Sequence, residues 1–284
     1  MTGDYGPNVV RGDLAAGVPR QRIDILKPTP MDPVRISDFE SEGVTLTPAT
    51  VAGFDDRAQA ILGANASPLL ELKPYLAIVR NQNPRTVVAY TVSWTVTLRN
   101  GMSEVHNTQF KFPDVVAGTN NGLALLQGRE IRTGEERVVG VGFEVWPPEH
   151  VNTYRDYGLE EAHRLTNVKS LEIALDAAIF DDGAMLGPDR SRLAEHFIEF
   201  VRAKQSLYRD IVAGLETGEA DVFARVRAIV SVPPTFSPTD PFALYPHLAA
   251  EEICRFQDRV MLEVFRRTLR REPFTIRRLS GKSD

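Results

Sequence analysis

The chain has little cysteine and no long apolar run. Cys254 is the only cysteine among 284 residues, so no disulfide can form within one chain. This excludes the small secreted scaffolds that disulfides hold together. No apolar stretch approaches the roughly 20 residues of a membrane-spanning helix, and residues 1–30 contain no uninterrupted hydrophobic signal segment. These absences favour the cytoplasm as the default compartment; a leader removed from the sequence would favour export instead.

Recognisable catalytic and cofactor motifs are also missing. The five histidines are scattered, and no serine lies in a Gly-x-Ser-x-Gly elbow. His196 and Glu199 share one helical turn, but the second histidine of the helical zinc signature is absent, so we expect His196 on the solvated side of a helix. A dinucleotide site requires a glycine turn that leads from a strand into a helix, and no helical pattern follows Gly140-x-Gly142. The sequence therefore predicts no catalytic residue, no metal ligand and no cofactor.

What the chain does contain is an ordinary globular composition. It is 43% hydrophobic and 25% charged, with a formal net charge of -5. These values are typical of a globular protein, and the length suffices for one large or two modest domains.

Residues 85–98 carry the clearest structural pattern. Large apolar side chains alternate there with hydroxyl-bearing ones, which predicts a long strand with one buried face. The apolar set is Val88, Tyr90, Val92, Trp94, Val96 and Leu98. Similar but shorter patterns predict strands at 75–79, 105–112, 138–145, 171–179 and 184–186.

Helical patterns lie on both sides of the predicted strands. Residues 48–62 predict a short amphipathic helix, and the 3.6-residue period after Asp189 predicts a long helix that runs nearly to Gly218 with Lys204 on its apolar face. Shorter patterns predict helices at 221–230 and 246–271. We expect Cys254 to be a packing residue beside the last of these apolar faces.

These elements predict an α+β protein with an immunoglobulin-like antiparallel β-sandwich. Residues 1–70 would form a Pro/Gly-rich arm with a short helix, extended up to residue 48 apart from a short strand at 22–26. Residues 71–187 would form the sandwich, and residues 188–284 a three-helix region with a basic tail.

The polar stretch 149–167 is a candidate interaction loop, because binding residues often lie on loops. Its candidate contact residues are His150, Tyr154, Tyr157 and His163. The alternative is a surface connection whose aromatic side chains cover a sheet edge.

The C-terminal tail is a candidate electrostatic contact. Residues 265–284 contain seven basic and two acidic residues, so the remainder of the chain carries a charge of -10. The basic contact residues are Arg266, Arg267, Arg270, Arg271, Arg277 and Arg278. They could bind nucleic acid or anionic lipid, or they could be the solvated end of a helix. Asp181, Asp182 and Asp189 suggest calcium, but turn and helix-terminus chemistry explains them without a metal.

Several short motifs together resemble a group of uncharacterised bacterial β-sandwich proteins. They span roughly residues 70–215, and the strongest is Ala-Ala-Ile-Phe-Asp-Asp-Gly at 177–183; the others are Lys-Pro-Tyr at 73–75, Val-Ala-Tyr at 88–90, Thr-Gly-Glu at 133–135 and Gly-Pro-Asp at 187–189. The resemblance implies a sandwich followed by a helix. It also implies an export signal in many members, which this chain lacks, and it supplies no catalytic residues.

The sequence therefore favours a non-catalytic binding or structural module, with a protein partner or a second copy of the chain contacting its sheet edges or the 149–167 loop. One alternative is a hydrolase in which His150 or His163 meets an acid and a nucleophile from distant positions. The other alternative is nucleic-acid or anionic-surface binding through the basic tail.

Overall fold

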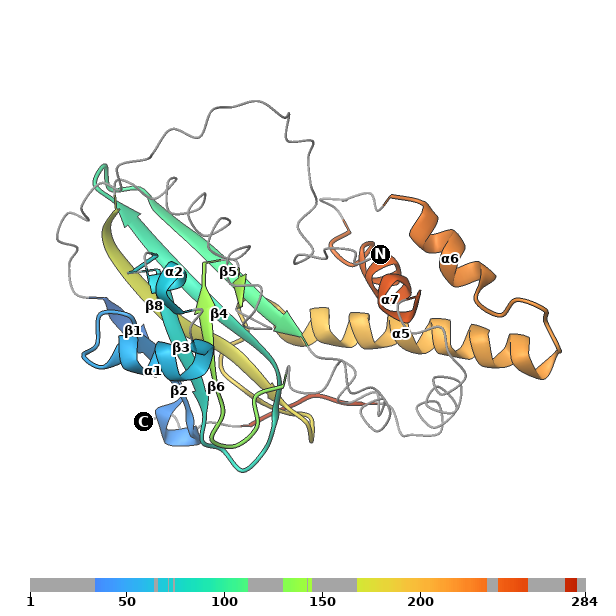
Figure 1. Cartoon of the computed structure of the whole chain (residues 1–284), viewed down its shortest axis with the longest axis horizontal. Coiled ribbons are helices and arrows are strands. Elements are labelled where there is room, and N and C mark those ends of the chain that lie inside the picture. Colours follow the sequence, from blue (N-terminus) through green and yellow to red (C-terminus); the bar gives the residue numbers. More distant parts are fainter. Residues whose placement is uncertain are drawn as a thin grey trace.

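Two β-sheets packed face to face form the body of the protein (Figure 1). The computed structural model describes residues 34–63, 66–70, 72–73, 75–111, 130–141, 143–144, 168–233, 240–254 and 274–279. Sheet A has the strand order β10-β9-β8-β4-β5, with β1 also pairing with β8, and sheet B has the order β2-β3-β6-β7. The chain is therefore α+β, as the sequence predicts.

Sheet A is mixed rather than purely antiparallel. Its strands are β1 (Arg35–Ser37), β4 (Val87–Leu98), β5 (Ser103–Lys111), β8 (Val168–Phe180), β9 (Ala184–Leu186) and β10 (Arg277–Arg278). Strand β1 runs parallel to β8, and β10 runs parallel to β9. Sheet B is antiparallel, with β2 (Val44–Pro48), β3 (Leu76–Asn81), β6 (Glu136–Gly140) and β7 (Phe143–Glu144).

Strand β4 confirms the long strand predicted at 85–98 and lies between β5 and β8. Its Tyr90 and Trp94 are fully buried in the core between the two sheets. Val88 was predicted on that face and is not there. A register shift between Val87 and Ala89 turns Val87 inward, so Val88 packs instead in the cluster on the other side of sheet A.

The outer face of sheet B is covered by two short helices, α1 (Phe54–Leu62) and α2 (Ala66–Leu70). Leu76 and Ile78 of β3 pack there against Phe54 and Leu69. The short helix predicted from residue 48 is thus confirmed from residue 54, while residue 48 ends β2.

The extended arm predicted up to residue 48 is wrong for residues 35–48. They supply β1, the short helix η1 (Glu40–Glu42) and β2. Val44 and Leu46 point into the core while Thr45 and Thr47 are half-buried, the alternation expected of a strand with one covered face. Residues 1–33, with the strand predicted at 22–26, lie outside the described residues.

The single strand predicted at 138–145 is also wrong. The chain reverses after β6, and β7 pairs back on it with Gly140 opposite Phe143. Alternating apolar residues continue through the reversal, which is why the period alone does not reveal it.

The long helix α5 (Leu193–Glu216) starts on the outer face of sheet A and extends beyond it (Figure 1). Its first turns place Leu193 and Phe197 against the sheet. Its distal part packs on α6 (Ala224–Ser231) and α7 (Tyr245–Cys254), with Cys254 half-buried at the edge of that cluster. The predicted continuation of the last helix to residue 271 lies outside the described residues.

Lys204 lies on the apolar face of α5, where the sequence places it, and only 1% of its side chain is exposed. Its amine pairs with the carboxylate of Glu252 on α7, and it lies 5.3 Å from the centre of the Phe200 ring. This ion pair joins the two helices, which also share an apolar cluster. None of the described helices combines the length and apolar character needed to cross a bilayer.

Candidate functional site

Most of the predicted contact residues lie outside the described residues. This applies to His150, Tyr154, Tyr157 and His163 of the interaction loop, so that loop stays a prediction. It applies equally to Arg266, Arg267, Arg270 and Arg271 of the tail. Arg277 and Arg278 are described, and they form β10 at the edge of sheet A.

The edge of sheet A next to β10 is built by a tight turn. Gly183 follows β8 with φ +81°, and its N–H donates to the Phe180 carbonyl at 2.9 Å. The carboxylate of Asp182 accepts the N–H of Ala184 at 2.9 Å. Asp182 is therefore an ordinary turn residue. Strand β9 follows this turn, and residues 274–279 lie along the edge of β9 that β8 does not occupy.

Residues 274–279, which we call the C-terminal segment, lie along this edge as a parallel strand. The N–H of Arg277 donates to the Gly183 carbonyl at 2.8 Å, and the N–H of Leu279 donates to the Met185 carbonyl at 2.9 Å. A Cβ on Gly183 would lie 2.1 Å from the carbonyl oxygen of Thr275. Only glycine at residue 183 allows the backbone of the segment to come this close.

Alternate side chains of the C-terminal segment face the protein. Phe274 and Ile276 are half-buried and pack in the cluster beneath α5, where the Phe274 ring lies 5.7 Å from that of Phe197. Arg277 and Arg278 are exposed. The segment thus has two apolar side chains that face the protein, separated by one exposed residue and followed by two basic residues.

The basic residues of the segment meet the acidic turn. A guanidinium nitrogen of Arg278 donates to the Pro188 carbonyl at 3.3 Å and lies 4.0 Å from the carboxylate of Asp189. Burial raises the pKa of Asp189, while the backbone N–H groups of Ala194 and Leu193 oppose that rise. The three acids of this turn and the two described arginines of the basic tail therefore share one edge of the sheet.

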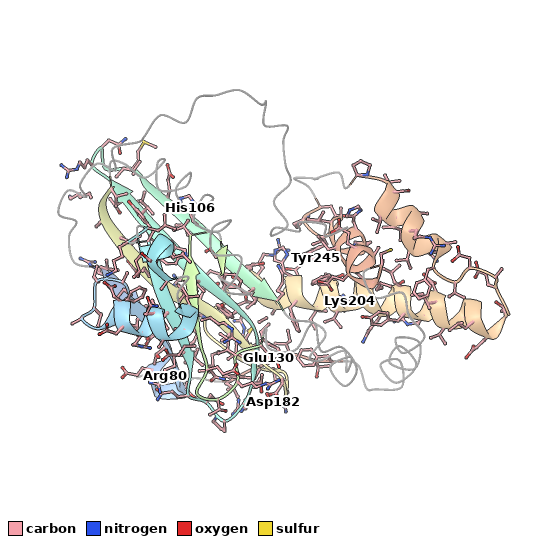
Figure 2. All side chains as sticks on the ribbon, in the orientation of Figure 1. Arg80, His106, Glu130, Asp182, Lys204 and Tyr245 are labelled. Atoms are coloured by element: carbon pink, nitrogen blue, oxygen red, sulfur yellow. The ribbon has the colours of Figure 1, made fainter. Side chains whose placement is uncertain are left out.

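A second polar cluster lies where the sandwich meets the helices (Figure 2). The amine of Lys111, at the end of β5, donates to Gln109 Oε1 at 3.0 Å and to the Tyr245 hydroxyl at 3.3 Å. That hydroxyl lies 2.6 Å from Nδ1 of His196 on α5. His196 was expected on a solvated face, but it is half-buried, because Tyr245 and Phe242 lie against its ring.

The environment of this cluster shifts three pKa values. Burial lowers the pKa of Lys111 to about 8 and raises that of the Tyr245 hydroxyl well above its ordinary value. Burial also lowers the pKa of His196, and the positive charges of Lys111 and Arg192 add to this effect. All three shifts favour the uncharged form of the group.

No sequence signal links the members of this cluster. Lys111 ends a strand, His196 lies in the first turn of α5, and Tyr245 opens α7 about 50 residues later. The sequence of the C-terminal segment does carry a signal of a strand, because the apolar Phe274 and Ile276 stand on either side of the polar Thr275. Within the described part of the chain, no three acidic, histidine or cysteine side chains gather as metal ligands.

Comparisons with protein-family models, with curated proteins and with solved structures found no match to this chain. The resemblance to bacterial β-sandwich proteins therefore stays a prediction.

Proposed function

We propose that this protein is a non-catalytic interaction protein that binds an extended polypeptide segment on the β9 edge of sheet A. The observation that supports this is the C-terminal segment, which occupies the edge as an added strand. Strand addition gives affinity through backbone hydrogen bonds and specificity through alternate side chains.

The contacts define the partner that this edge would accept. An aromatic residue fits beside Phe197, and an aliphatic residue two positions later extends the same apolar contact. Of the two basic residues that follow, Arg277 reaches the Asp182 carbonyl, and Arg278 reaches the Pro188 carbonyl and the Asp189 carboxylate. The proposed partner is therefore an extended segment with the pattern aromatic-x-aliphatic-basic-basic, from another protein or a second copy of this chain.

Finer structural and functional assignments remain predictions. They include the immunoglobulin-like identity of the sandwich, the three-helix composition of the C-terminal region, and the division of the chain at residues 70 and 187. The interaction loop at 149–167 and the binding of nucleic acid or an anionic surface by the basic tail remain predictions as well.

The test is binding of the segment in trans. A chain ending at residue 273 is labelled with ¹⁵N and titrated with a peptide of residues 273–282. We expect saturable chemical-shift changes at β9 and its preceding turn, with a dissociation constant on the order of 0.1–1 mM, because two half-buried side chains and two backbone hydrogen bonds supply the affinity.

Two control peptides separate strand addition from charge attraction. Replacing Phe274 and Ile276 with alanine should abolish the shifts, and replacing Arg277 and Arg278 with glutamine should weaken them. A folded shortened chain that shows no shifts with the natural peptide would refute the proposal and leave the segment a structural strand. If the shortened chain does not fold, a protease site is placed at residue 265 of the full chain, and the chain is cleaved there after folding. Excess labelled peptide is then added to replace the cleaved tail on β9. If the peptide does not replace the tail, the proposal is refuted.

A further inference from the structure

We propose that Lys111 is an amine site for small aldehydes, which it binds covalently as imines where the sandwich meets the helices. This goes beyond the proposed function, because it concerns a different part of the molecule and a different class of ligand.

The hydrogen bonds around Lys111 match a neutral amine. Such an amine has two N–H groups and one lone pair, and the described residues provide two acceptors, Gln109 Oε1 and the Tyr245 hydroxyl. The amide of Gln109 is itself oriented by donation to the Ser191 carbonyl at 2.8 Å. The lone pair thus remains available for a ligand.

Lys204, which is fully buried, shows what is different about the half-buried Lys111. Lys204 pairs with the carboxylate of Glu252, which stabilises an ammonium ion. Among the described residues, no carboxylate lies within ion-pair distance of Lys111, and Arg192, the other cation that acts on His196, is paired with Glu195. The surroundings of Lys111 therefore disfavour its charged form, which agrees with the lowered pKa described above.

The Tyr245 hydroxyl, positioned by His196, supplies the proton transfers that imine formation needs. The amine nitrogen attacks the carbonyl carbon and gives a carbinolamine; loss of its hydroxyl as water then forms the C=N bond. With its proton on Nε2, His196 accepts a hydrogen bond from the Tyr245 hydroxyl at Nδ1 and so holds that hydroxyl beside Lys111. Tyr245 gives its proton to the departing hydroxyl, and the proton that leaves the Lys111 nitrogen as the C=N bond forms restores the Tyr245 hydroxyl. No redox partner is required.

The test uses the full chain, acetaldehyde and cyanoborohydride, which reduces an imine to a stable N-ethyl amine. Peptide mass mapping follows each lysine over time. At pH 7.5, a pKa of about 8 leaves about a quarter of the amine neutral, against about one part in a thousand for an ordinary lysine. We expect Lys111 to be ethylated at least tenfold faster than Lys73, with a rate that rises through pH 8.

Variants distinguish the site from general exposure. Tyr245→Phe should slow ethylation of Lys111 several-fold while leaving Lys73 unchanged, and Lys111→Arg should remove the fast phase. Lys204 serves as the buried control and should remain unmodified. The proposal is overturned if Lys111 is ethylated no faster than Lys73, if its rate rises only near pH 10, or if it resists the aldehyde as Lys204 does.

Discussion

The sharpest test of the sheet edge is the substitution Gly183→Ala. The new Cβ would lie 2.1 Å from the Thr275 carbonyl oxygen, a distance that no side chain tolerates. Because the obstacle is backbone, rotating a side chain cannot relieve it. The C-terminal segment must therefore leave the edge or move away from it.

The matched control is Gly101→Ala. Gly101 also has a positive φ, +86° against +81° at Gly183, but nothing lies within 4 Å of its Cβ position. Both substitutions share a backbone cost of about 1–2 kcal/mol. Gly183→Ala adds the lost contacts of Phe274 and Ile276, at about 1 kcal/mol for each half-buried side chain. The extra loss is at most about 2 kcal/mol, because the released residues regain conformational freedom.

Limited trypsin digestion measures this release directly, since trypsin cleaves after Arg277 and Arg278. A change of about 2 kcal/mol in docking corresponds to about a thirtyfold faster cleavage at these two bonds when opening is fast. Gly101→Ala should leave the rate unchanged. Equal cleavage rates in the two variants would show that the segment does not depend on the close approach at Gly183, and would refute the description of this edge.

Three further predictions test the core between the sheets, the packing of the helices and the cluster around Lys111. Trp94→Ala should lower the free energy of unfolding by about 3–5 kcal/mol in urea, because the residue is fully buried between the sheets; a loss below about 1 kcal/mol would contradict that placement. Lys204→Met should destabilise the protein by about 1–3 kcal/mol, and adding Glu252→Leu should restore most of the loss in thermal melts, since the first change strands a partly buried carboxylate. The folded-state pKa of Lys111, about 8, lies below its ordinary 10.5, so stability should rise between pH 8 and 10.5 as the folded form loses its proton first. Lys111→Met should remove that part of the rise, and an unchanged pH profile would show that the pKa of Lys111 is not lowered in the folded protein.

Local periodicity predicted the parts of the fold that carry their own signal. Strand β4 and helix α5 are long, so their apolar residues repeat often enough to define both the element and its buried face. Even Lys204 was placed correctly, because helical spacing depends on position rather than on residue type.

The failures come from features that periodicity cannot represent. The reversal between β6 and β7 leaves the alternation intact, and the register shift near Val88 moves one side chain to the other face without changing the pattern. The cluster of Lys111, His196 and Tyr245 forms only when a strand and two helices meet, so neither the spacing nor the type of these residues marks it in advance.

The order of strands in sheet A has a consequence for synthesis of the protein on the ribosome. Strand β10 lies about 90 residues after β9, and a ribosome adding roughly 5–20 residues per second needs about 5–18 s to cover that distance. During this time β9 is available while its final neighbour has not yet been translated. Nascent chains emerging from adjacent ribosomes would be able to reach the same edge, so chaperone capture during translation should matter more for this protein than for one whose outermost strands are made early.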